Sequence, residues 1–353
     1  MRNLLYISIG LLCLTQGCKE TTPAERIRQE NSEQNAKEDS YEMSVVFVSC
    51  NDQDRPQPLW KPIANNIPAV FVWGGDNIYA DTENMDKMAN DYQKLLQHPD
   101  YAEINRETIV LGTWDDHDYG KNDAGKEWPY KEEAKQLLLD FLGYHESDSI
   151  RKRPGVYHSR TITMEAGSVK FILLDTRTFR TPLKESTIPG HRYMAWPETH
   201  KGTILGEAQW KWLEDELADD TADFTVLVSS IQFLSDDHGW EKWGNFPSEV
   251  KKMYALLKHA KAQNILMLSG DRHMAEISVN TAAGLPYPLV DFTSSGLTHT
   301  WIDSETEANE YRVSNVVKQL NFGRLKFDFE NEKVRFEIRG ADDFLYEAFV
   351  QNY

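Results

Sequence analysis

The sequence predicts an α/β protein in which two β-sheets pack against each other and helices cover the outside. Six apolar segments of strand length run along the chain, and segments with helical spacing lie between them. Near the C-terminus the pattern changes to two short runs in which apolar and charged residues alternate. Strands that alternate with helices and are followed by antiparallel strands are typical of layered sheets with outer helices.

The expected strands fall into two groups. Continuous aliphatic and β-branched runs are typical of strands buried on both faces, and they lie at 45–49, 69–73, 108–111, 169–174, 224–229 and 265–268. The late alternating runs, 325–329 and 334–338, are separated by a short polar turn and predict an antiparallel hairpin with one solvent-exposed face.

Helices are expected where apolar residues recur every three or four positions between these strands. Such segments cover 85–96, 134–142, 207–217 and 250–257. Gly143 follows the second segment as a plausible C-terminal cap, and Pro247 stands just before the fourth.

The first eighteen residues have the pattern of a secretory signal. One charged residue, Arg2, precedes an apolar stretch over 4–14 that is too short to span a bilayer, and Cys18 follows a small residue. This resembles a bacterial lipobox, although Leu14 lies four positions before the cysteine and not three. We therefore expect lipidation of Cys18 and an exported, lipid-anchored protein at the periplasmic or outer cell surface. The alternative is cleavage without a lipid.

Residues 19–42 are polar and almost free of apolar side chains, so they predict a disordered tether. The remaining 43–353 are expected to form a single domain that acts as a monomer. With Cys13 in the signal and Cys18 lipidated, Cys50 is the only free thiol of this domain, and no disulfide framework is possible. Cys50 is either buried and inert or bound to a ligand.

The net charge of the chain limits the classes of molecule that it can bind. The chain of 353 residues has 56 acidic and 38 basic residues and a net charge of −18. No basic excess is available to neutralise a phosphate backbone, so a nucleic-acid-binding module is not expected. The acidic excess is either a solvated surface or, in part, a means of holding cations.

Metal-seeking side chains follow several of the predicted strands directly. GGDNIYAD carries Asp76 and Tyr79, WDDHD carries Asp116, and SGDRH carries Asp271, while Cys50 follows the first strand. Ligands bind beyond the carboxyl ends of strands in α/β sheets, so these distant segments can converge on one site. Each cluster alone also has a structural interpretation, as a turn, a helix cap or a solvated corner.

These residues belong to motifs that resemble the alkaline phosphatase D (PhoD-like) metallophosphatase family. The resemblance extends from about Val45 to at least Thr300. It is carried by FVSC, GGDNIYAD, GTWDDHDYGKNDAGKEWP, RPGVYHS, LLDTRTFR, LGEAQWKWLEDEL, SSIQF, HGWEKWGNFP, SGDRHMAE and TSSGLTH. The family implies a metallophosphoesterase-like αββα sandwich of two mixed sheets with flanking helices.

The resemblance also implies a two-metal site, with Fe³⁺ and Ca²⁺ as the expected pair and Zn²⁺ or Mn²⁺ as alternatives. Asp76 would bridge the two metals. Iron would be bound by Cys50, Tyr79 and His273. The second metal would be bound by Asp116 and Asp271, and Asp76 would be shared by both metals. Phenolate ligation requires a strongly polarising cation, and carboxylate ligation favours calcium over zinc.

Further roles are expected near these ligands. His117 would stabilise the transition state or protonate the leaving group, or else orient Asp116. Arg177 would contact phosphate, or pair with Asp175 or another carboxylate. Asp118 and Asn122 are possible phosphate or outer metal contacts.

The expected activity is hydrolysis of a phosphate mono- or diester by in-line attack of an activated water. The competing hypothesis is a calcium-dependent binding lipoprotein whose carboxylates hold structural ions. A structural calcium site needs neither the thiol of Cys50 nor the phenol of Tyr79, which favours the enzyme. Trp240 and Trp243 either form a pocket wall near the site or pack in the core.

Overall fold

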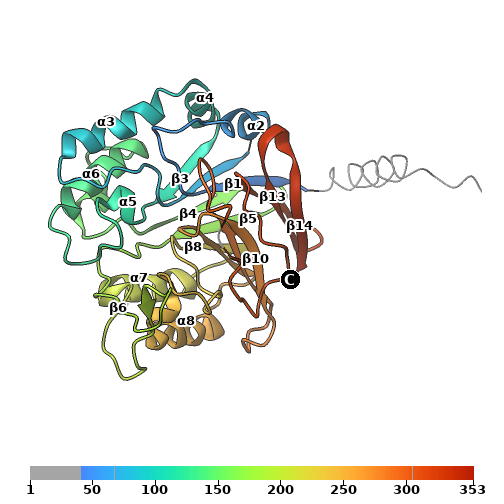
Figure 1. Ribbon diagram of the computed structural model, residues 1–353. Coiled ribbons are helices and arrows are strands. Elements are labelled where there is room, and N and C mark those ends of the chain that lie inside the picture. The colour runs from blue at the N-terminus through green and yellow to red at the C-terminus, as the bar shows by residue number, and fades with distance from the viewer. Residues whose placement is uncertain (1–40, 67, 304) are drawn as a thin grey trace, which may run out of the picture. The chain divides into compact units, whose positions relative to one another are not determined.

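Two six-stranded mixed sheets lie face to face, with helices on the outer side of each (Figure 1). The computed structural model describes residues 41–66, 68–303 and 305–353. The predicted signal 1–18, the lipidation of Cys18 and nearly all of the tether 19–42 lie outside the described residues. The last residue of the tether segment, Glu42, is described, and its backbone N–H donates to Phe327 O at 3.0 Å.

The first sheet has the strand order β14-β13-β12-β1-β2-β3. Its strands are β1 (Met43–Val48), β2 (Val70–Gly74), β3 (Ile109–Thr113), β12 (Phe322–Asp328), β13 (Lys333–Arg339) and β14 (Leu345–Asn352). β1, β2 and β3 pair in parallel, whereas β12, β13 and β14 join antiparallel. The carboxyl ends of the three parallel strands therefore meet at one edge of the sheet.

The second sheet has the order β10-β11-β9-β8-β5-β4. Its strands are β4 (His158–Thr163), β5 (Ser168–Leu173), β8 (Phe224–Val228), β9 (Ile265–Ser269), β10 (Ala275–Asn280) and β11 (Leu289–Ser294). The inner four are parallel and the two edge strands antiparallel. A two-stranded ribbon, β6 (Lys184–Glu185) with β7 (Tyr193–Met194), lies outside both sheets.

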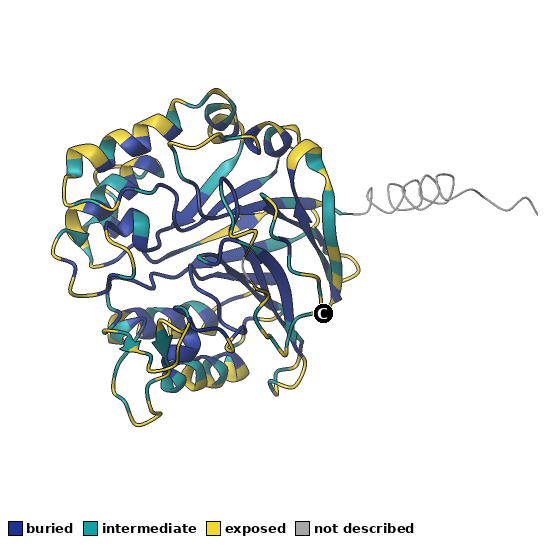
Figure 2. Cartoon of the chain, in the orientation of Figure 1, coloured by how far each residue is buried: buried dark blue, intermediate teal, exposed yellow. Residues whose placement is uncertain are grey.

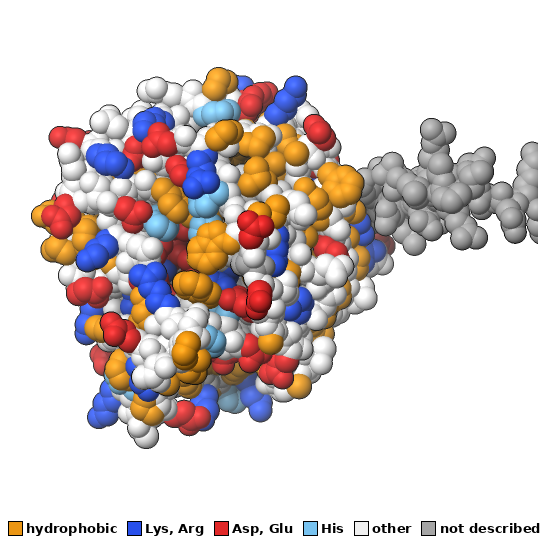
Figure 3. Space-filling model, viewed as in Figure 1, with side chains coloured by type: hydrophobic (Ala, Val, Ile, Leu, Met, Phe, Trp, Pro, Cys, Tyr) orange, Lys and Arg blue, Asp and Glu red, His pale blue; other side chains and the backbone are white. Residues whose placement is uncertain are grey.

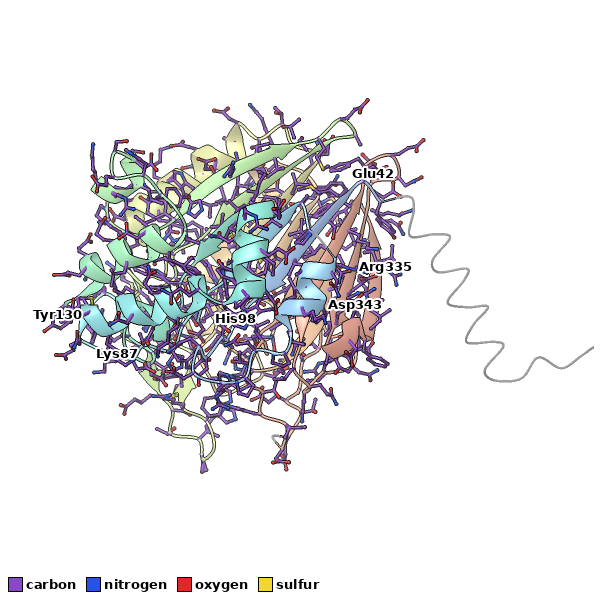
Figure 4. The ribbon with its side chains drawn as sticks, turned by 90° about the horizontal axis from the view of Figure 1, so that it is seen from above. Glu42, Lys87, His98, Tyr130, Arg335 and Asp343 are labelled. Atoms are coloured by element: carbon purple, nitrogen blue, oxygen red, sulfur yellow. The ribbon has the colours of Figure 1, made fainter. Side chains whose placement is uncertain are left out.

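Helices cover the outer faces in two groups. The first group packs on the first sheet and consists of α2 (Trp60–Asn65), α3 (Met85–Leu96), α4 (Pro99–Glu107), α5 (Asp116–Tyr119) and α6 (Lys131–Phe141); the second consists of α7 (Gly206–Ala218) and α8 (Pro247–His259). Short 3₁₀ turns lie at η1 (Ser149–Lys152), η2 (Trp243–Asn245) and η3 (Ala341–Asp343). Figure 4 views the first group from above, with Lys87 and Tyr130 far from Arg335 on β13.

Three layers of apolar side chains hold the sheets and helices together. Phe47, Leu266 and Phe336 belong to the central layer between the sheets, and each is fully buried. Trp73 lies in the layer under the first helices, and Met253 lies in the layer under α7 and α8. The central strands β2, β8 and β9 are fully buried while the helices expose one face (Figure 2), so the predicted αββα sandwich is confirmed.

The predicted elements are present, and several others were not anticipated. All six apolar segments, the hairpin and the four helices appear in the structure, and Pro247 is the first residue of α8. The sequence did not indicate β4, β10, β11, β14 or the short helices α2, α4 and α5. Among the residues that the structure describes, no helix has the length and apolar character needed to cross a bilayer.

Candidate metal centre

The predicted ligands lie in sharp turns that directly follow strands. Cys50, Asp76, Asp271 and His273 all have positive φ, at 60°, 53°, 65° and 52°. Non-glycine residues adopt this left-handed conformation at a cost of about 1–3 kcal/mol, and such residues concentrate at functional sites. The turns direct these side chains toward one point beyond the sheet edge, and the strained backbone lowers local stability.

Gly75 permits one close approach between these turns. Its φ is +98°, and a Cβ at this position would lie 2.6 Å from the Cβ of Asp115. The turn after β2 can therefore pack directly against the turn after β3, which brings Asp76 next to Asp116.

Four carboxylates converge at the centre of the site. Asp76, Asp115, Asp116 and Asp271 each place an oxygen within 4.8 Å of the others. A second close group combines Asp76 and Asp116 with His117. The structure thus brings together carboxylates that are separated by almost two hundred residues, as the strand-end pattern predicts.

The thiol and the phenol adjoin the other side of Asp76. Cys50 Sγ lies 3.4 Å from Asp76 Oδ2, and the Tyr79 hydroxyl lies 3.2 Å from the same oxygen. Tyr79 Oη is also 3.4 Å from His273 Nε2. Asp76 Oδ1 instead accepts the backbone N–H of His117 at 3.3 Å. Asp76 therefore stands between the two predicted ligand sets, although Cys50 and His273 join neither of the two close groups.

In the metal-free protein, burial shifts the pKa values of the predicted ligands. Burial raises the pKa of Asp76 and of Asp271 well above the ordinary range, and neighbouring carboxylates add to the rise. Burial also raises the pKa of Asp115 to about 6. Burial also raises the pKa of the Cys50 thiol and lowers the pKa of His273 to about 3. The site therefore holds a neutral imidazole and several acids that ionise only at a cost unless positive charge is supplied.

A pH dependence of stability follows for the chelator-treated protein. Because the folded-state pKa values of Asp76, Asp115 and Asp271 are raised, these carboxyls bind more protons in the folded protein than in the unfolded chain above pH 4. Its free energy of unfolding should therefore fall as pH rises from about 4 through 6, by about 1.4 kcal/mol per pH unit for each carboxyl still protonated. Urea denaturation between pH 4.5 and 8 measures this slope. Asp271→Asn should flatten it, and bound metal should abolish it; a flat profile for the metal-free wild type contradicts the assignment.

His117 is fixed beside the carboxylates by three contacts. Its Nδ1 lies 2.6 Å from Asp81 Oδ2, its ring stacks on Tyr79 with centroids 4.0 Å apart, and its Nε2 lies 4.0 Å from Asp116 Oδ1. Burial opposes the charged ring, but Asp116 and Asp76 raise the pKa of His117 to about 11 in the metal-free protein. Asp81 is the partner that orients this imidazole.

Asp118 does not face the site. Its carboxylate accepts the backbone N–H of Asp115 at 2.7 Å, and the backbone N–H groups of Asp76 and Asn77 at 3.2 Å. The Asn77 side chain adds a further bond at 2.6 Å. The expected phosphate or outer-metal role of Asp118 is therefore wrong: this buried carboxylate ties two ligand-bearing turns together. Asn122 is exposed, and its backbone N–H donates to Asp81 Oδ1 at 3.1 Å.

Arg177 lies beneath the site and has no exposed surface. Its Nε donates to Asp115 Oδ1 at 2.6 Å and its Nη1 to Glu241 Oε2 at 2.7 Å. Arg180 Nε lies 2.7 Å from the other oxygen of Glu241. A direct substrate contact by Arg177 is incompatible with this burial, so the carboxylate-pairing alternative describes it, with Asp115 and Glu241 as partners in place of Asp175.

Sequence reasoning assigned no role to several neighbours of the ligands. The rings of His299 and His273 have centroids 4.5 Å apart, and Trp301 stacks on His273 with centroids 5.0 Å apart and an interplanar angle of 7°. Both follow the TSSGL motif, and the available signal was two aromatic residues shortly after it. Figure 3 shows acidic, histidine and hydrophobic side chains gathered near the centre of one face.

The comparison with known families decides the affiliation. The model of the PhoD-like phosphatase family matches residues 45–338, which is most of the chain. The chain belongs to the PhoD-like phosphatase family. The resemblance that the motifs indicated is thereby confirmed.

This PhoD-like chain is also similar to characterised proteins. Alkaline phosphatase D of Bacillus subtilis (strain 168) is 25% identical over 282 residues, which cover 66% of this chain and 46% of that protein. The chain thus spans about half the length of this relative. A structure of PhoD superposes with a TM-score of 0.68 at 17% identity, covering 88% of this chain and 70% of the other. A dimetal phosphatase from Danio rerio gives a TM-score of 0.56 at 11% identity, covering 89% and 99%. These two structures show a shared fold.

Proposed function

We propose that this PhoD-like protein is a metal-dependent phosphoric ester hydrolase. One observation supports this most strongly: four carboxylates from three separate turns meet beside a buried thiol and a phenol. A purely structural calcium site would need only the oxygens. The family membership agrees with the proposal.

The residues fit a pair of cations. Asp115 Oδ2 and Asp116 Oδ1 are buried without a hydrogen-bond partner, which is costly for carboxylate oxygens unless a cation lies beside them. We assign Cys50, Tyr79 and His273 to an iron ion and Asp116 and Asp271 to a calcium ion, with Asp76 shared. When bound, the two ions would polarise the phosphate ester and lower the pKa of the attacking water.

The side chains of this chain supply the remaining functions. His117 Nδ1–H donates to Asp81, which leaves Nε2–H directed toward the carboxylates and able to give its proton to the departing ester oxygen. Stacking on Tyr79 fixes the plane of this imidazole. The Arg177 guanidinium keeps Asp115 ionised next to Asp116 and thereby holds the turn after β3 in place.

Elemental analysis of the native protein, combined with an activity comparison, tests the proposal. We expect iron and a second metal in near-equal amounts, a visible colour from phenolate-bound iron, and hydrolysis of p-nitrophenyl phosphate or bis-p-nitrophenyl phosphate. Failure of metal-replete protein to hydrolyse either ester would sink the enzyme and leave the calcium-dependent binding lipoprotein as the interpretation.

Cys50→Ala tests the asymmetric ligand set. Removing the thiol should lower iron content severalfold and activity by at least about 10- to 100-fold, the loss typical when a residue that only supports a metal ligand is removed. The fold should persist, because the thiol is a small group whose polar contacts are with Ser49 and with the proposed ligands Asp76 and Tyr79. Far-ultraviolet circular dichroism checks the fold and elemental analysis checks iron. Retention of full iron and full activity would show that Cys50 is not a ligand.

We also propose that Cys18 carries a lipid and that the protein is exported. The support is the signal-like composition of residues 1–18 and the polar segment that follows. Cells grown with radiolabelled palmitate should label the wild type and not Cys18→Ser. Absence of label in the wild type would favour cleavage without a lipid.

A further inference from the structure

A cavity of about 490 Å³ adjoins the metal centre on the side of His273. Arg272, between the ligands Asp271 and His273 in the chain, forms part of its wall, and so does Trp301, which stacks on His273. The cavity is therefore adjacent to the predicted ligands Asp271 and His273. Its volume lies in the range that holds a drug-sized organic molecule, and no residue assigned to the metals or to proton transfer lines it.

Two tryptophans form an angled aromatic wall in this cavity. Trp240 and Trp301 meet edge to face, with centroids 5.3 Å apart and an interplanar angle of 69°. The Trp240 indole N–H donates to Glu307 Oε1 at 2.9 Å, which fixes the ring in position. Trp301 is 43% exposed. Half-exposed indoles held rigidly beside a catalytic centre are an established means of stacking a planar ring. Trp243, by contrast, is 1% exposed and packs in the core.

The charges around the cavity are balanced. Arg272 Nη2 lies 2.5 Å from Glu307 Oε2, and Arg312 Nε lies 2.5 Å from Glu276 Oε2. Asp237 and Glu305 also line the cavity as acidic residues, and Lys318 lines it as a basic one. With its arginines already paired, the cavity does not favour a second phosphate or a carboxylate. It favours an uncharged group with a flat apolar face and polar edges.

We propose that this cavity binds the organic group of the substrate, and that this group carries a planar aromatic or heteroaromatic ring that stacks on Trp240 and Trp301. The inference rests on the proposed function, since it extends the same site from the phosphate to the alcohol that is esterified to it. It narrows the substrate class from phosphate esters in general to esters of ring-bearing alcohols such as nucleosides.

A pair of ligands that differ only in the ring tests the inference. The methylenephosphonate analogues of thymidine 5′-monophosphate and 2-deoxyribose 5-phosphate have a P–C bond that the enzyme cannot hydrolyse and share the phosphonate and the sugar. Calorimetry with the metal-loaded protein gives both dissociation constants. We expect the thymidine compound to bind about tenfold more tightly, as stacking of one base on an aromatic side chain implies. Trp240→Ala should remove this difference and Trp240→Phe should retain most of it. Trp240 is chosen because Trp301 also packs on His273.

Trp212→Ala is the matched control, since Trp212 is a partly exposed residue of α7 that contacts Tyr157 and lies outside the cavity. This variant should preserve the tenfold difference. Equal binding of the two ligands, or a difference that survives Trp240→Ala, overturns the inference. Hydrolysis of methyl p-nitrophenyl phosphate by the same preparations reports separately on the proposed function. Ring-dependent binding without hydrolysis would reject the enzyme and keep the cavity, whereas hydrolysis without ring-dependent binding would do the reverse.

Discussion

Replacing Asp76 with asparagine should lower kcat/KM for ester hydrolysis by about 10³-fold or more and remove both metals. This carboxylate contacts the thiol of Cys50 and the hydroxyl of Tyr79 through one oxygen, and it belongs to both close groups around Asp116. In the proposed assignment Asp76 is shared between two cations, so its loss would withdraw ligation from both at once. Metal ions contribute several kcal/mol of transition-state stabilisation, and about 4 kcal/mol corresponds to a factor of 10³.

The same substitution should act in the opposite direction on the metal-free protein. Burial and the neighbouring carboxylates raise the pKa of Asp76, so its ionised form destabilises the fold when no cation is present. Asp76→Asn should therefore match or exceed the chelator-treated wild type in urea denaturation at pH 8, although it has lost activity. Asp86→Asn, an exposed aspartate in the first turn of α3, is the control and should leave metal content unchanged and lower stability by no more than about 1 kcal/mol. An inactive Asp76→Asn protein that still binds two metals would contradict the bridging position.

The sequence predicted the strand ends of this site because a strand and the turn after it are local features. The runs before Cys50, Asp76 and Asp271 are short and strongly apolar, and each ligand stands within a few residues of its strand. What remained hidden depends on pairing across the fold. Glu241 and Arg177 are separated by 64 residues, and nothing local marks them as partners. The inward turn of Asp118 was equally invisible, because a carboxylate that binds backbone N–H groups and one that binds a cation look alike in sequence.

The same distinction applies to the fold. The central strands are continuous apolar runs and were found, whereas β4, an edge strand, exposes three of its residues and reads HSRTIT. β11 is fully buried but contains Asp291, whose carboxylate accepts the backbone N–H groups of Phe233 and Leu234 at 2.9 Å. A buried aspartate breaks the apolar pattern unless its partners are known. The strands that sequence patterns miss are therefore those at a sheet edge and those with a buried polar residue, because tertiary contacts there outweigh the local hydrophobic pattern.

Arg177→Met should destabilise the protein by about 3–5 kcal/mol in free energy of unfolding. The guanidinium is fully buried and bonded to Asp115 and Glu241, which are themselves buried. Methionine fills a similar volume but leaves two carboxylates without their main counter-charge, and breaking a buried ion pair from one side has a cost of this size. Urea denaturation of the metal-loaded protein measures the change.

Two comparisons separate this support role from a phosphate-binding role. Arg106→Met removes an exposed arginine paired with Glu107, both more than half exposed, and should change stability by less than about 1 kcal/mol. Adding Asp115→Asn to Arg177→Met should restore part of the lost stability, because the unpaired charge is removed together with its partner. A phosphate-binding arginine would give the reverse pattern: near wild-type unfolding, a raised KM and no rescue by the second substitution. The observed geometry requires the first pattern, since Arg177 reaches the chemistry only by holding Asp115, and with it the turn that presents Asp116.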